Sequence, residues 1–72
     1  MPHVIEIVGI NGTPKRVIKE SIRIIDHPVR DAVNGKEIME KYVEMVVVGH
    51  RGQWKEWVPL NLFKKLNPEV KL

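Results

Sequence analysis

The chain has 72 residues, no cysteine and a net charge of +3, which allows one small domain spanning residues 1–72. The lack of cysteine excludes a disulfide framework and a thiolate metal site. No stretch approaches the roughly 20 apolar residues of a membrane-spanning helix, and the N-terminus does not resemble a signal peptide. We therefore expect a cytoplasmic protein that does not bind membranes. A core this small barely offsets the entropy of folding, so a homo-oligomer is also expected.

The positive charge is unevenly distributed along the chain. Residues 1–40 carry equal numbers of basic and acidic side chains, so the whole excess lies in residues 41–72. A basic half attracts phosphate or acidic partners. An excess of three charges is modest, and by itself it is only a weak indication of nucleic-acid binding.

The first third of the chain fits two structures. His3 to Ile10 is rich in β-branched residues and predicts a strand, and Asn11-Gly12 predicts a turn. Residues 13–25 then fit a helix with Thr13 as N-cap and Pro14 in its first position. They also fit a strand that pairs back on the first one. The apolar spacing favours the helix, whereas the turn and the β-branched content favour the strand, so both interpretations stay open.

A polar connection is predicted in the middle of the chain. Asp26-His27-Pro28 should end the preceding element, because a residue before proline avoids the α region. Residues 29–37 then form the connection. Within it, Asn34 to Glu37 predicts either a turn or the cap of a short helix that continues to Tyr42.

The clearest pattern is a β-hairpin from Tyr42 to Leu60. Tyr42 to Val48 predicts one strand, His50 to Gln53 the turn, and Trp54 to Leu60 the returning strand.

With a loop of two or four residues, the expected partners are Val48 with Lys55, Val46 with Trp57, and Met45 with Val58. Side chains alternate between the faces of a sheet. One face should therefore hold Val43, Met45, Val47, Trp54, Val58 and Leu60, with Glu56 as its only charge. The other face should hold Tyr42, Glu44, Val46, Val48, Lys55 and Trp57.

A short helical turn is predicted after this hairpin. Pro59 ends the strand and Asn61 caps the turn. Leu62, Phe63 and Leu66 should point inward, while Lys64 and Lys65 face water. Strand, tight turn, strand, Val58-Pro59 and helical turn form an order that is similar to the closing half of SH3-like barrels, over residues 42–66. The resemblance implies a β-rich fold, a small SH3-like barrel with a short C-terminal helical turn. The alternative is an α+β fold, with one helix packed on a three-stranded sheet.

Residues with catalytic or metal-binding chemistry are sparse and widely spaced. His3, His27 and His50 lack the short spacings that place two metal ligands on one element. Ser21 has no neighbouring histidine in the sequence to activate it. The loop from Gly9 to Lys15 lacks the glycine spacings of known phosphate-binding loops. We therefore expect a protein that is not an enzyme and that uses neither a metal nor a cofactor.

The remaining candidate is the surface around Trp57. Trp, Tyr and Arg dominate protein interfaces, and aromatic residues beside basic ones also form stacking platforms for single-stranded nucleic acid. The first hypothesis is a binding or assembly module that holds a protein partner, or its own second subunit, through the 42–60 hairpin. The second is a basic nucleic-acid-binding domain that uses Trp57 with Arg51, Lys55, Lys64 and Lys65. Packing of both hairpin faces inside a barrel would leave no such surface. The candidate binding residues are Tyr42, Val46, Val48, Arg51, Lys55, Trp57, Lys64 and Lys65.

Overall fold

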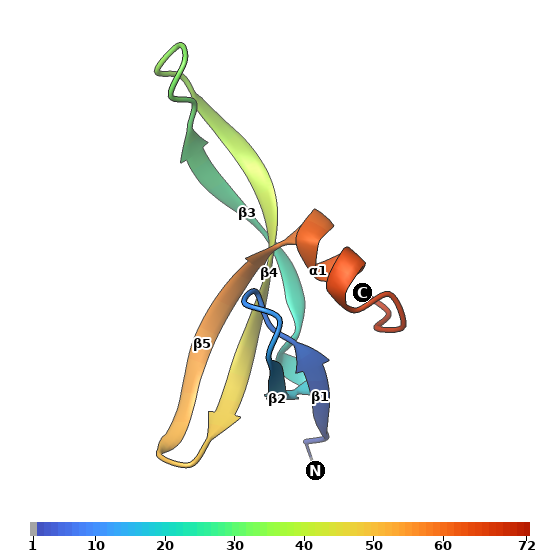
Figure 1. Ribbon diagram of the computed structural model, residues 1–72. Helices are drawn as coiled ribbons and strands as arrows, with labels where there is room; N and C mark the ends of the chain where they lie inside the picture. Colours follow the sequence, from blue (N-terminus) through green and yellow to red (C-terminus); the bar gives the residue numbers. More distant parts are fainter. Residues whose placement is uncertain (1) are drawn as a thin grey trace.

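The computed structural model describes residues 2–72, which fold into one antiparallel sheet and a C-terminal helix (Figure 1). The β-rich class predicted from the sequence is confirmed. The elements in chain order are β1 (Val4–Val8), β2 (Pro14–Ile18), the 3-10 turn η1 (Lys19–Ser21), β3 (Arg23–Arg30), β4 (Glu37–Gly49), β5 (Gly52–Pro59) and α1 (Leu60–Leu66).

The central strand is β4, which has 13 residues. Its C-terminal part, Tyr42–Gly49, pairs with β5 along one edge. Along the other edge, residues 37–44 pair with β3, and Val47 lies opposite Val17 of β2. The turn η1 therefore carries the chain from β2 to β3 along the same edge of β4. β1 pairs with β2.

Within residues 2–72 the sheet stays open, because no pairing joins β1 to β5. The closed SH3-like barrel that the resemblance implied is therefore not formed.

The strand interpretation of the first third is the right one. β1 and β2 form a tight hairpin in which Val4 lies opposite Ile18 and Val8 opposite Pro14. Gly12 takes a φ of 82° in its turn, a conformation that glycine adopts without a steric penalty. The predicted helix over residues 13–25, and with it the α+β alternative, is wrong. The pairing of the β-branched segment with β1 outweighs its partly helical spacing.

The predicted polar connection is present but shorter than expected, as a loop over residues 31–36 with a turn that includes Asn34. The short helix and the end of the preceding element at Pro28 are wrong. β3 continues through Pro28 to Arg30 and pairs with β4 over its whole length. Proline lacks an N–H group and is tolerated on an edge strand, where that group would have no partner in the sheet. β3 and the N-terminal part of β4 form a two-stranded ribbon, the arm (residues 24–41), which projects from the rest of the molecule in Figure 1. The molecule is consequently elongated, with a longest dimension of 44 Å.

The predicted hairpin is present, with its register shifted by two residues. The turn is His50-Arg51 between the opposed Gly49 and Gly52, so Met45 lies opposite Glu56 and not Val58. Gly52 has a φ of 129°, which allows the turn to close this tightly. A shift of two residues keeps every side chain on its face. The two predicted faces are therefore confirmed except for Leu60, which begins α1 and is not part of β5. The individual pairs Val48–Lys55 and Val46–Trp57 are not formed.

One face of the sheet, the inner face, holds the core. It is made by the buried side chains of Ile7, Val17, Val43, Met45, Val47, Val58 and Phe63. Phe63 comes from α1, so the helix covers this face, and Lys64 and Lys65 are exposed as predicted. Asn61 is not the cap: the N-cap position is Pro59, which forms no side-chain bond. No helix within residues 2–72 has the length and apolar character needed to cross a membrane.

A different asparagine fixes the end of the helix. Asn67 is 1% exposed. Its Oδ1 accepts a hydrogen bond from the Val8 N–H at 2.7 Å, and its Nδ2 donates to the Val8 carbonyl at 2.9 Å. The amide thus pairs with β1 as a neighbouring strand would, and it ties the C-terminal segment to the sheet.

Candidate functional site

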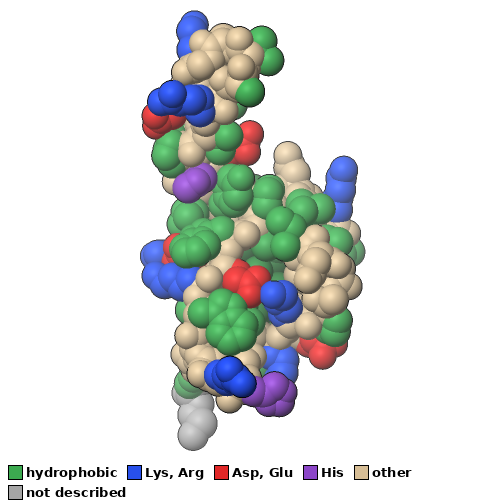
Figure 2. Space-filling view, turned by 60° about the vertical axis from the view of Figure 1, so that its left-hand side comes forward, with side chains coloured by type: hydrophobic (Ala, Val, Ile, Leu, Met, Phe, Trp, Pro, Cys, Tyr) green, Lys and Arg blue, Asp and Glu red, His purple; other side chains and the backbone are tan. Residues whose placement is uncertain are grey.

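The candidate surface is the outer face of the sheet, opposite α1. Alternation along β4 and β5 places Tyr42, Val46 and Val48 on this face, together with Lys55 and Trp57. In Figure 2 hydrophobic side chains extend from the body of the molecule onto the arm and are interrupted by a few charged ones.

Glu44 organises the centre of the outer face. Its carboxylate accepts hydrogen bonds from the Trp57 Nε1–H at 3.0 Å and the Arg23 Nε–H at 2.8 Å. The Arg23 Nη2 lies 2.6 Å away and the Lys55 Nζ 3.7 Å away. The hydrogen bonds from Trp57 and Arg23 lower the pKa of Glu44 below its ordinary value. Glu44 is therefore held as a carboxylate that fixes the orientation of the Trp57 indole.

Beside this network lies a hollow of about 300 Å³ lined by His27, Tyr42 and Trp57, the outer hollow. The His27 and Tyr42 rings meet edge to face, with 5.2 Å between their centroids. Trp57 is 50% exposed although its N–H group is bonded. The hollow thus presents three oriented aromatic rings to solvent at the base of the arm.

The arm extends the apolar character of this face. The register of β3 and β4 places Ile25, Val29 and Ile38 on the same side as Tyr42. Ile38 is 46% exposed. A two-stranded ribbon with apolar residues in water is only marginally stable on its own, so the arm is a surface that would gain from being covered.

The structure brings together five of the eight candidate residues and separates three. Tyr42, Val46, Val48, Lys55 and Trp57 share the outer face. Arg51 lies at the hairpin tip, and Lys64 and Lys65 lie on α1, which packs on the inner face.

Sequence reasoning missed Arg23 and His27, which β3 brings to this surface. Their positions follow only from the register of β3 on β4. Residues 23–30 do not alternate between apolar and polar side chains, so the local sequence carried no clear signal of this strand.

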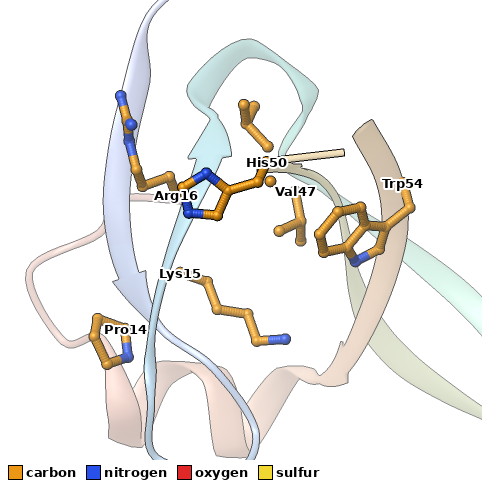
Figure 3. Close-up of a pocket in the computed structure, with 8 residues that line it drawn as sticks. Pro14, Lys15, Arg16, Val47, His50 and Trp54 are labelled. Atoms are coloured by element: carbon orange, nitrogen blue, oxygen red, sulfur yellow. The ribbon is translucent and has the colours of Figure 1, made fainter. Parts of the chain in front are cut away.

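A second cavity, the inner pocket, lies on the inner face beyond the reach of α1 and has a volume of about 400 Å³. Figure 3 shows Trp54 and His50 on opposite sides of it, with Lys15 running toward Trp54 below them. The Lys15 Nζ donates to both oxygens of Glu56, at 3.0 and 2.9 Å, and the Trp54 Nε1–H donates to one of them at 2.7 Å. Burial raises the pKa of Glu56, but the hydrogen bonds from Lys15 and Trp54 outweigh it and lower the pKa overall.

The three histidines lie in different parts of the fold: His3 precedes β1, His27 is in β3 and His50 is in the β4–β5 turn. The His3 Nδ1 lies 2.7 Å from the Glu20 carboxylate, and this hydrogen bond lowers the pKa of Glu20 to about 2. Ser21 donates to the Ile18 carbonyl and accepts from the Val46 N–H, which anchors η1 to β4. No group of three or more metal-ligating side chains forms among residues 2–72.

Comparison of the chain with protein-family models, curated proteins and solved structures found no match.

Proposed function

We propose that this protein is a non-enzymatic assembly module that associates with a second copy of itself through the outer face of the 42–60 hairpin. The observation that carries the proposal is the state of Trp57. Its indole is half exposed, yet its orientation is fixed by Glu44. Rigid, exposed Trp side chains in aromatic surroundings are the residues that dominate binding energy in protein interfaces.

The size of the core supports self-association. Seven hydrophobic side chains are buried among residues 2–72, and the sequence has no cysteine that could form a disulfide and limit the entropy of the unfolded chain. Domains of this size commonly gain their remaining stability from oligomerisation. Burial of apolar surface contributes about 25 cal/mol per Å², so covering the outer hollow and the apolar side of the arm would add to a small core.

The charges on the outer face suit an identical partner. Glu44, at the centre of the outer face, is already paired with Arg23 and Lys55. Burial of the outer face would therefore not leave this carboxylate without a cation. On the arm, the pair of polar residues on the same side as Tyr42 is His27 opposite Glu40, whereas the pairs Asp26–Lys41 and Arg30–Glu37 lie on the other side. The outer face thus carries the cations Arg23 and Lys55 together with the acids Glu44 and Glu40, and a surface that carries both signs can be self-complementary about a twofold axis.

We do not extend the proposal to nucleic acid on this face. Lys64 and Lys65 lie on the helix that covers the inner face, and Lys55 is engaged with Glu44. The outer face therefore lacks the row of free cations that would follow a phosphate backbone.

The test is a molecular-mass measurement by size exclusion with light scattering. The wild-type chain should elute at twice 8.4 kDa or a higher multiple. Trp57→Lys, which places a charge in the centre of the proposed interface, should shift the protein to the monomer.

The matched control is Trp54→Lys, at a similarly exposed tryptophan on the same strand but on the inner face. It should leave the mass unchanged. A wild-type monomer at millimolar concentration, or equal effects of the two substitutions, would overturn the proposal.

A further inference from the structure

We propose that the inner pocket binds a nucleobase that carries a phosphate, either as a free nucleotide or as one residue of a single strand. This site is separate from the outer face: it opens between β2, the β4–β5 turn and β5, at the end of the inner face that α1 leaves uncovered. Its volume of about 400 Å³ lies within the usual range of ligand pockets.

The aromatic wall of the pocket is built and held in place. Trp54 is 45% exposed, and its ring lies against the backbone of Gly49, where a Cβ atom would come within 2.3 Å of the Trp54 Cη2. Gly49 does not have a positive φ, so the close approach of the ring is what requires glycine there. Glu56 fixes the edge of the indole. The face of the ring is therefore presented to the pocket without a loss of side-chain entropy on binding.

The polar side chain on the inner face of the pocket is Lys15, which is paired with Glu56 outside the lining. The Lys15 stem passes over Gly9, where a Cβ atom would lie 2.9 Å from the Lys15 Cε, and its Nζ meets Glu56. Their side chains are only 23% and 21% exposed. The Lys15 ammonium uses two of its three N–H donors on Glu56, so its third donor suits an acceptor on the edge of a heterocycle.

His50 and Arg16 line the remaining sides of the pocket. Figure 3 places the His50 ring across the pocket from Trp54, and the guanidinium of Arg16 points away from the indole. Arg16 lines the pocket, and within residues 2–72 it has no carboxylate within 4.0 Å. A planar ring stacked on Trp54 would therefore have one free cation, Arg16, at the rim for its phosphate.

The experiment uses the two tryptophans separately. In Trp57→Phe the sole indole is Trp54, and in Trp54→Phe it is Trp57. Each protein is titrated with AMP, with adenosine and with a short oligo-dA, while Trp fluorescence and the indole N–H signal in NMR are followed. We expect saturable quenching and a shift of the indole signal in Trp57→Phe only. Adenosine should bind more weakly than AMP because it lacks the phosphate.

Comparable affinities for AMP and oligo-dA would identify a nucleotide site, and a clear preference for oligo-dA would identify a single-strand site. Trp54→Ala should weaken binding about 5- to 150-fold, the equivalent of one base stack. His50→Ala, at the exposed turn, tests the opposite wall without disturbing the core and should also weaken binding. The proposal is overturned if neither ligand changes the Trp54 signals at millimolar concentration, or if Trp57 responds instead.

Discussion

Replacing Asn67 with alanine should destabilise the fold far more than replacing any exposed polar residue. The substitution removes the two hydrogen bonds that the buried amide forms with the backbone of Val8. Leaving a buried donor or acceptor unsatisfied costs about 1–3 kcal/mol for each group. Val8 is only partly buried, so we take the lower half of this range and expect a loss of about 2–4 kcal/mol for the pair. A domain of this length has a free energy of unfolding of about 4–11 kcal/mol, so the loss is a large fraction of the total.

Urea unfolding followed by circular dichroism measures this loss as a lower midpoint at an unchanged slope. The matched control is Asn61→Ala on the same helix, because Asn61 is exposed and its side chain makes no hydrogen bond within residues 2–72. Its effect should stay within about 0.5 kcal/mol. Similar midpoints for the two variants would refute the idea that Asn67 acts as a substitute strand for the edge of β1.

Three further predictions concern stability. Carboxyl groups whose pKa is lower in the folded chain than in the unfolded one stabilise the fold above the unfolded value of 4.5 and lose this contribution as pH falls through the folded pKa. The groups concerned are Glu20, with a pKa of about 2, Glu44 and Glu56. The urea midpoint should therefore fall between pH 5 and about 2, and an unchanged midpoint over this interval would contradict the ion-pair geometry. Ser21→Ala should cost about 1–3 kcal/mol because the Val46 N–H loses its acceptor, and a neutral effect in the same assay would show that η1 needs no such anchor. Gly52→Ala should lower the free energy of unfolding by about 1–3 kcal/mol, because an alanine is strained at the Gly52 φ of 129°. A variant as stable as the wild type would show that this position does not require glycine.

The hairpin could be predicted because its signal is local. Alternation with a period of two assigns Tyr42 and Trp57 to one face and Val43 and Val58 to the other for any loop with an even number of residues. The register itself depends on which residues form the turn, and this was decided by the ability of Gly52 to adopt a positive φ. No feature of the strands alone fixes that choice.

The arm could not be predicted for a different reason. Pro28 was interpreted as the end of an element, but a proline is tolerated where its strand has a free edge. Whether β3 has a free edge is a property of the whole sheet. Arg23 and His27 were therefore missed as parts of the outer face, since their positions depend on the pairing of β3 with β4. Trp54 was assigned correctly to the inner face, yet it is exposed because the sheet does not close over it.

The two tryptophans of β5 show how one strand can serve two surfaces. Trp54 and Trp57 are three residues apart, so alternation places them on opposite faces. Each indole N–H is held by a glutamate, and each glutamate is held by a cation: Glu56 by Lys15 on the inner face, and Glu44 by Arg23 on the outer face. Both rings are thereby oriented before anything binds, which lowers the entropy cost of binding on either side. Because the two networks share no residue, disruption of one should leave the other intact, and self-association and ligand binding can be tested independently in the same chain.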